Sequence, residues 1–211
     1  MALIQPRCPR DKRIGITYKK YANHILKELF RKTIHLCSAF LPYFFGLAKF
    51  PFLIALAAVL VSYIISEFLR LNGINIPIIS SVTKVAARKR DENKFVIGPV
   101  TLCIGIILAE LLWEPLPAAI GIYALAFGDG LASLAGKLFG RIQIPLTQGK
   151  TAAGSLVCFT AIFISTFAAC RQTHIALIIA TVGMFVEVLP LKDLDNILIP
   201  VGLGGLATIL L

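Results

Sequence analysis

The chain has 211 residues, of which 57% are hydrophobic and only 15% charged, and its formal net charge is +10. This is the composition of a membrane protein, and it excludes a soluble globular domain because no polar segment is long enough to bury its own core. The basic residues lie outside the apolar runs, so an anionic lipid surface and an anionic substrate are the expected partners, and nucleic acid is not. The predicted fold class is an all-α, polytopic membrane bundle.

The N-terminal part of the chain is basic. Residues 1–20 are expected to form a flexible tail, and residues 21–211 a single transmembrane domain. The first 32 residues hold nine Lys or Arg and lack the apolar segment of a cleavable signal peptide. After Tyr21 the apolar residues recur at helical spacing, which predicts an interfacial helix running directly into the first span.

Seven apolar runs follow, each near the length that a membrane-spanning helix needs. Pro42 is expected to kink the first helix, because an internal proline removes a backbone hydrogen bond. With seven spans and a cytoplasmic N-terminus, nineteen of the 21 Lys and Arg residues lie inside, as the positive-inside rule requires. The runs are 33–48, 51–69, 95–112, 116–136, 154–170, 174–190 and 196–211.

The segment ELFRKTIHL places Glu28, Arg31, Lys32 and His35 on one face of the helix that enters the bilayer. One interpretation of Arg31 and Lys32 is that they snorkel to the surface, with a Glu28–Lys32 pair stabilising the helix. The other is that they bind phosphate or take part in chemistry. His35 lies deeper on the same face, which favours a role as proton carrier or as hydrogen-bond donor to phosphate.

Acidic and basic residues near the membrane surfaces are assigned no chemistry. The loop 71–94, with its ARKRDENK cluster, is expected to be solvated charge at the lipid surface. Glu67, near the end of its run, is expected to face the headgroups, and Glu110 is expected to be an interface residue near the outer surface.

Asp129 lies inside an apolar run, in the stretch FGDGLASLAGKLFGR. A carboxylate in that position is costly unless it is paired, hydrated or bound to a cation, so its default interpretation is functional. Ala132, Gly136 and Gly140 follow at the small-xxx-small spacing of closely packed helices, which does not by itself explain Asp129.

Beyond Asp129 the chain leaves the membrane through a basic, glycine-rich loop with hydroxyl groups, which suits a metal-bound polyphosphate at a membrane surface. The alternative is an ordinary basic cytoplasmic loop. The GKT tripeptide in it is not a P-loop, because the glycine required five residues before Gly149 is replaced by Ile144. The candidate phosphate-binding residues are Lys137, Arg141, Gly149, Lys150, Thr151, Gly154 and Ser155.

The stretch FVEVLPLKDLDNILIP holds the last candidate residues, Glu187, Asp195 and Asn196. A helix-capping role is the alternative for Asp195 and Asn196. Glu187 has apolar neighbours, which a cap does not explain. Two acidic sites on separate helices, Asp129 together with Glu187 or Asp195, are the minimum for holding Mg²⁺ between protein and phosphates.

Together these segments resemble the polyprenol kinase family, which includes dolichol kinase, phytol kinase and the CTP-dependent diacylglycerol kinase of yeast. The resemblance covers roughly residues 25–202 and rests on ELFRKTIHL, on ARKRDENKFVIGP, on FGDGLASLAGKLFGR followed by GKTAAGS, and on the spacing of Glu187, Asp195, Asn196 and Pro200.

The resemblance implies transfer of the γ-phosphate of CTP to the hydroxyl of a membrane lipid, with Mg²⁺ or another divalent cation. It implies catalytic roles for Asp129, His35 and Lys32, although the sequence does not choose between His35 and a carboxylate as the base. Arg31 and Asn196 would join the phosphate-binding residues, and Asp129, Glu187 and Asp195 would bind the metal. The expected location is a bacterial inner membrane or endoplasmic reticulum type membrane, with a cytoplasmic active site.

Two other functions remain open. The family is distantly similar to phosphatidate cytidylyltransferase, so nucleotidyl transfer from CTP to a lipid phosphate is the first alternative. A small ion-coupled transporter, with Asp129 and Glu187 as its ion site, is the second, and it is less favoured because no inverted repeat is visible. The oligomeric state is open, and a homo-oligomer is compatible with the sequence.

Overall fold

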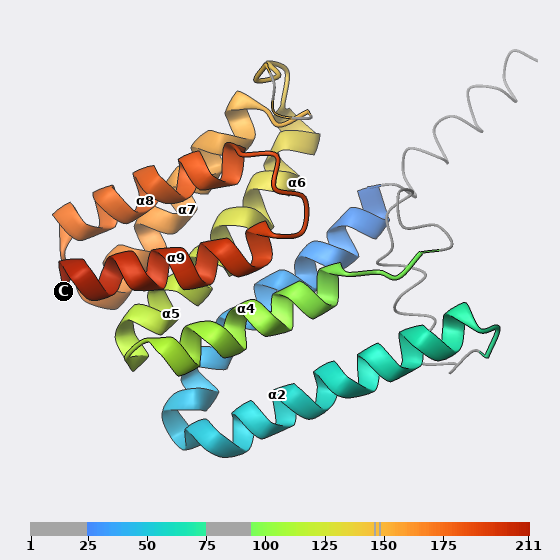
Figure 1. Cartoon of the computed structure of the whole chain (residues 1–211). Helices are drawn as coiled ribbons and strands as arrows, with labels where there is room; N and C mark the ends of the chain where they lie inside the picture. The colour runs from blue at the N-terminus through green and yellow to red at the C-terminus, as the bar shows by residue number, and fades with distance from the viewer. Residues whose placement is uncertain (1–24, 75–93, 146, 148) are drawn as a thin grey trace, which may run out of the picture.

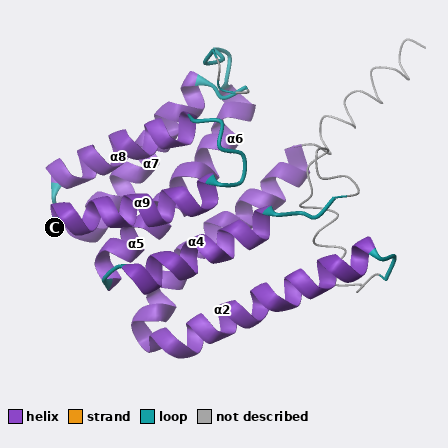
Figure 2. Cartoon of the chain, viewed as in Figure 1, coloured by secondary structure: helices purple, strands orange, loops and turns teal. Residues whose placement is uncertain are grey.

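The computed structural model describes residues 25–74, 94–145, 147 and 149–211 (Figure 1). The expected tail, 1–20, and most of the basic loop, 71–94, lie outside these residues. Throughout the described part the regular structure is helical, apart from a single bridge between Gln143 and Thr151 (Figure 2). The all-α class is therefore confirmed.

The described residues form a series of helices. The first, residues 25–37, is called helix 25–37 below. After it come η1 (Ser38–Phe40), α2 (Leu41–Leu71), α4 (Gly98–Leu112), α5 (Pro115–Tyr123), η3 (Ala124–Asp129), α6 (Gly130–Phe139), α7 (Ala152–Cys170), α8 (Thr173–Val188) and α9 (Asp195–Leu210).

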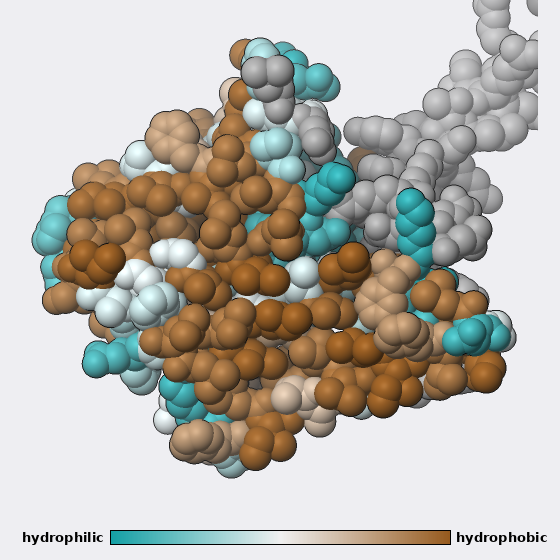
Figure 3. Space-filling model, in the orientation of Figure 1, coloured by the Kyte–Doolittle hydropathy of each residue, from teal (hydrophilic) through white to brown (hydrophobic). Residues whose placement is uncertain are grey.

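Three helical stretches of the described chain are long and apolar enough to cross a membrane, namely Ile25–Leu71, Pro115–Phe139 and Ala152–Cys170. The helices α4, α8 and α9 are apolar but shorter. Each of the seven apolar runs coincides with a helix, while the count of seven spans and the cytoplasmic N-terminus stay predictions. The hydrophobic surface seen in Figure 3, over α2, α4 and α9, is that of a membrane protein.

The long stretch Ile25–Leu71 is folded back on itself. Ala48 leaves the helical conformation, with φ −156° and ψ 85°, and Figure 1 shows that the helices before and after it run in opposite directions. The break lies at Ala48 and not at Pro42, which falls in the first turn of α2. Pro51 follows the break, in an early-helix position where a missing N–H group costs little.

Glycines let the central helices touch through their backbones. A Cβ atom on Gly105 of α4 would lie 2.1 Å from the carbonyl oxygen of Asn196, and one on Gly121 of α5 would lie 2.1 Å from that of Pro200. Both contacts are with α9. On the other side, a Cβ on Gly136 would lie 2.9 Å from the Thr151 hydroxyl, so the close packing expected of the small residues in α6 is present.

The connections place the polar segments at one end of the bundle. In Figure 1 the start of helix 25–37, the loop after α6, the end of α8 and the start of α9 lie at this end. The turn from α4 to α5, the turn from α7 to α8 and the C-terminus lie at the opposite end. Segments far apart in the sequence can therefore contribute to one site.

We expect Gly121→Ala to destabilise the bundle, because the added methyl group must push α5 away from the backbone of α9. Overpacking of this kind costs about 1–3 kcal/mol. The matched control is Gly202→Ala within α9, where the nearest atom to the new Cβ is Leu198 Cδ1 at 3.9 Å. Thermal unfolding of the purified protein in detergent should show a lower midpoint for the first variant only. Equal midpoints would contradict the backbone contact.

Candidate functional site

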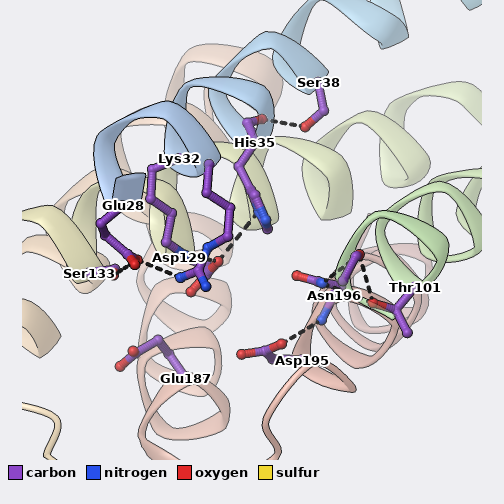
Figure 4. Close-up of polar contacts among 12 residues, drawn as sticks. Glu28, Lys32, His35, Ser38, Thr101, Asp129, Ser133, Glu187, Asp195 and Asn196 are labelled. Atoms are coloured by element: carbon purple, nitrogen blue, oxygen red, sulfur yellow. Dashed lines mark hydrogen bonds and ion pairs between the residues drawn. The ribbon is translucent and has the colours of Figure 1, made fainter. Parts of the chain in front are cut away.

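Three buried side chains meet at Asp129. Lys32 Nζ lies 2.5 Å from Asp129 Oδ2 and donates a hydrogen bond to it, and His35 Nδ1 lies 3.4 Å from the same oxygen. The exposed fractions are 2% for Lys32, 6% for His35 and 7% for Asp129. Figure 4 shows the lysine and histidine side chains reaching from helix 25–37 toward the carboxylate. The structure thus brings together the three residues proposed as catalytic.

The backbone around Asp129 explains how its side chain reaches helix 25–37. Asp129 ends η3, a π-helical turn that joins α5 to α6, and such turns occur frequently at functional sites. A Cβ on Gly128 would lie 2.7 Å from Ile162 Cγ1, and one on Gly130 would lie 3.3 Å from Leu36 Cδ2. Glycine on both sides of Asp129 therefore permits close approach of α7 and of helix 25–37.

A second buried carboxylate, Glu28, lies beside this cluster. Its Oε1 atom is 2.5 Å from an Arg31 guanidinium nitrogen and accepts a hydrogen bond from the Ser133 hydroxyl at 2.7 Å. Its Oε2 atom is 2.7 Å from Lys137 Nζ. The Glu28–Lys32 pair considered from the sequence is therefore not the one formed, because Lys32 reaches Asp129 instead.

Asn196 ties the start of α9 to α4. Its amide nitrogen donates to the Thr101 hydroxyl at 2.9 Å and to the Gly98 carbonyl at 3.3 Å. Asp195 Oδ1 accepts the backbone N–H of Asn196 at 2.9 Å. The residue that precedes α9 as its cap is Leu194, and no side chain caps the helix there, so the capping alternative does not describe Asn196.

A pocket opens between helix 25–37, α4, η3 and the start of α9. Its wall is charged on one part and apolar on another, so it can hold a ligand that has both an ionic and a hydrocarbon portion. The polar lining residues are Arg31, Lys32, His35, Asp129, Asp193, Asp195 and Asn196. The apolar ones are Ile34, Val96, Pro99 and Leu102.

The predicted phosphate loop forms a compact turn at the same end of the bundle. Backbone bonds from Ile144 N–H to the Lys150 carbonyl (2.8 Å) and from Ala152 N–H to the Ile142 carbonyl (3.0 Å) close it. Gly149 has φ +95°, a conformation that favours glycine. None of the loop residues that the structure describes lines the pocket, and Arg141 is exposed.

The start of α7 follows this loop and carries the remaining candidates. Thr151 caps the helix by accepting a hydrogen bond from Gly154 N–H at 3.2 Å, and Lys150 Nζ lies 2.9 Å from Glu187 Oε1. The Ser155 hydroxyl and Glu187 Oε2 are buried and have no hydrogen-bond partner within the described residues. These groups offer both donors and acceptors that the protein itself leaves unused.

The proposed metal ligands are only partly assembled. Asp129 and Asp195 line the same pocket, whereas Glu187 pairs with Lys150. Within the ranges that the structure covers, no three His, Cys, Asp or Glu side chains form a metal-binding group. Two carboxylates nonetheless fit Mg²⁺, which proteins commonly bind through one or two carboxylates together with substrate phosphates. Both contacts to Asp129 fall on Oδ2, which leaves Oδ1 for a cation.

The position of Glu67 was misjudged from the sequence. Glu67 is 1% exposed and does not face the headgroups: it pairs with Arg70 at 2.7 Å and accepts the Val96 N–H at 2.8 Å. Glu110 is also buried, 3.9 Å from Lys49 at the opposite end of the bundle. The spacing of Glu67 and Arg70, one helical turn apart, could have predicted their ion pair. Nothing in the sequence predicted the hydrogen bond from Val96.

Comparisons with known proteins identify kinases of isoprenoid alcohols. The chain is 29% identical to phytol kinase 1, chloroplastic, of Arabidopsis thaliana over 89% of this chain and 66% of that protein. It is 29% identical to probable phytol kinase 1, chloroplastic, of Glycine max, over 64% and 45% respectively. It is 32% identical to farnesol kinase, chloroplastic, of Arabidopsis thaliana over 40% and 28%.

The chain thus has homologues named phytol kinase and farnesol kinase, which confirms the resemblance to the polyprenol kinase family. It spans just under two thirds of the Arabidopsis phytol kinase and less of the other two relatives. No protein-family model matches the chain, and no solved structure matches it.

We expect Lys32→Met to destabilise the protein, because it leaves the buried Asp129 carboxylate without its closest partner. Removing one member of a buried ion pair typically costs about 3–5 kcal/mol. In the double variant Lys32→Met/Asp129→Asn neither charge remains, so its unfolding midpoint in detergent should exceed that of Lys32→Met alone. Strictly additive losses from the two single changes would show that the residues do not interact.

Proposed function

We propose that this homologue of phytol and farnesol kinases transfers the γ-phosphate of CTP to the hydroxyl group of a membrane lipid alcohol. The names of the relatives support an isoprenoid alcohol, such as phytol, farnesol or a longer polyprenol, ahead of diacylglycerol. For this chain, the observation that carries the proposal is the buried Lys32–Asp129–His35 cluster on a pocket with one apolar wall.

The acceptor alcohol is assigned to the apolar side of the pocket. Ile34, Val96 and Leu102 offer contact to the hydrocarbon next to the hydroxyl, and the remaining tail stays in the bilayer. As the hydroxyl oxygen bonds to phosphorus, its proton must move to a base. We assign that role to His35, because its imidazole lines the same pocket, whereas Asp129 Oδ2 already receives Lys32.

The triphosphate is assigned to the side of the cluster that faces α6 and α7. Arg31 and Lys137 next to Glu28, and Lys150 next to Glu187, supply positive charge there. The N–H groups at the start of α7 add donors at the positive end of a helix dipole. Phosphoryl transfer needs mainly positioning and charge stabilisation, so groups of this kind are sufficient.

A divalent cation would be held by Asp129 and Asp195, with Glu187 as a further ligand or as a partner through water. When bound, Mg²⁺ supplies neutralisation of charge on the phosphate oxygens. The site would lie on the side of the membrane that carries the basic loops, which is the cytoplasmic side by the positive-inside rule.

The reaction is tested with purified protein in detergent, CTP labelled in the γ-phosphate, and phytol, farnesol, a long polyprenol and diacylglycerol as separate acceptors. We expect label in the lipid and release of CDP, with little transfer from labelled ATP. Cytidine in the lipid with release of pyrophosphate would establish the cytidylyltransferase instead. No transfer to any acceptor, together with ion-dependent uptake into proteoliposomes, would establish a transporter.

Asp129→Asn should reduce transfer by at least ~100-fold, because it removes the charge that pairs with Lys32 and binds the cation. Chelation of divalent cations should abolish transfer by the unmodified protein, and added Mg²⁺ should restore it. The control is Glu110→Gln, a buried carboxylate at the opposite end of the bundle, which should keep the acceptor turnover. An active Asp129→Asn protein would remove this residue from the mechanism.

A further inference from the structure

We infer that Glu28 is a positioning residue that fixes helix 25–37 against α6, so that Lys32 and His35 meet Asp129. The kinetic test of this inference rests on the proposed function. A second test measures protein stability and does not depend on that function. Neither a catalytic nor a binding role was assigned to Glu28 from the sequence.

The contacts of Glu28 join two helices. Its carboxylate is almost fully buried, with 8% of the side chain exposed. Arg31 lies on the same helix, one turn further on, whereas Ser133 and Lys137 belong to α6. A buried carboxylate with three donors is strongly restrained, because loss of any donor leaves part of its charge uncompensated.

The spacing of these residues forms a register between the two helices. Glu28 and Lys32 are four residues apart on helix 25–37, and Asp129 and Ser133 are four residues apart in η3 and α6, so each pair lies on one face. Lys32 meets Asp129 while Glu28 meets Ser133, which is an antiparallel match. Sliding either helix by one turn would break both contacts at once.

The balance of charge gives Glu28 a second effect on the same geometry. Three cations, Arg31, Lys32 and Lys137, share the two carboxylates Glu28 and Asp129. Without the charge on Glu28, Arg31 and Lys137 would lose the carboxylate with which they pair. In a poorly solvated site, the attraction of the unpaired Arg31 guanidinium to Asp129 would then compete with that of Lys32.

The first test compares the kinetics of Glu28→Gln with those of the unmodified protein, because the variant keeps the shape and removes only the charge. We expect kcat to fall by roughly 100-fold, the effect of a small misplacement of catalytic groups. The KM for CTP should change by less than about threefold, since Arg31 and Lys137 remain present. Glu28→Asp, which keeps the charge, should recover part of kcat, and Glu110→Gln should show no such loss.

A kcat for Glu28→Gln equal to that of the unmodified protein would overturn the inference. A raised KM with unchanged kcat would do so as well, because it would make Glu28 part of nucleotide binding. If the unmodified protein itself phosphorylates no acceptor, the proposed function fails and a second test decides the inference. This test measures the unfolding midpoints of Lys32→Met, Asp129→Asn and their double variant, each with and without Glu28→Gln. We expect the coupling between Lys32 and Asp129 to disappear when Glu28→Gln is present. A coupling that persists would overturn the inference.

Discussion

The fold depends on a constraint at Asp129: a charge inside an apolar bundle must find a partner of opposite sign. The partner is Lys32, which is itself buried and has the same need. Neither residue tolerates the other's absence, so helix 25–37 must dock where η3 ends. Because His35 follows Lys32 by about one turn, that docking also brings an imidazole to the carboxylate. One ion pair thus sets both the packing of the helix and the composition of the site.

The same docking determines what the pocket can accept. Helix 25–37 contributes Arg31 and Ile34 to the pocket wall, and α4 contributes Pro99 and Leu102. Charged groups and hydrocarbon therefore face one space at the end of a bundle whose surface over α2, α4 and α9 is largely apolar (Figure 3). Such a space suits a reaction between a water-soluble phosphate donor and a lipid, since each can approach from the phase in which it dissolves.

Much of the site could be predicted from local features of the sequence. Three patterns could each be recognised within a single segment: an aspartate in an apolar run, a histidine and a lysine on one helical face, and small residues at four-residue spacing. The apolar runs likewise coincide with helices, because hydrophobic length is a local property. The ion-pair partners were harder to predict from the sequence. Glu28 has Lys32 one turn away but pairs with Arg31 and Lys137.

Other features depended on contacts that the sequence does not reveal. The reversal at Ala48 falls where the apolar run 33–48 ends, before the next run begins at residue 51, but the sequence does not show that the two helices fold back against each other there. The buried Glu67 carboxylate accepts a hydrogen bond from the N–H of Val96, which lies 29 residues further along the chain. The ion pair between Glu187 and Lys150 was not predicted either, because the position of Lys150 is set by the turn of the loop that precedes α7.

The π-helical turn that ends at Asp129 has a consequence for the spacing of the chain. A π-helical turn closes i→i+5 hydrogen bonds and so holds more residues than a turn of an α-helix. Shortening 124–129 by one residue would therefore change the rotation of α6 relative to α5. Asp129, Ser133 and Lys137 would then swing together away from helix 25–37, even though every amino acid of the site was retained. A substitution changes one of these side chains at a time, whereas a change in the length of this stretch moves all three together.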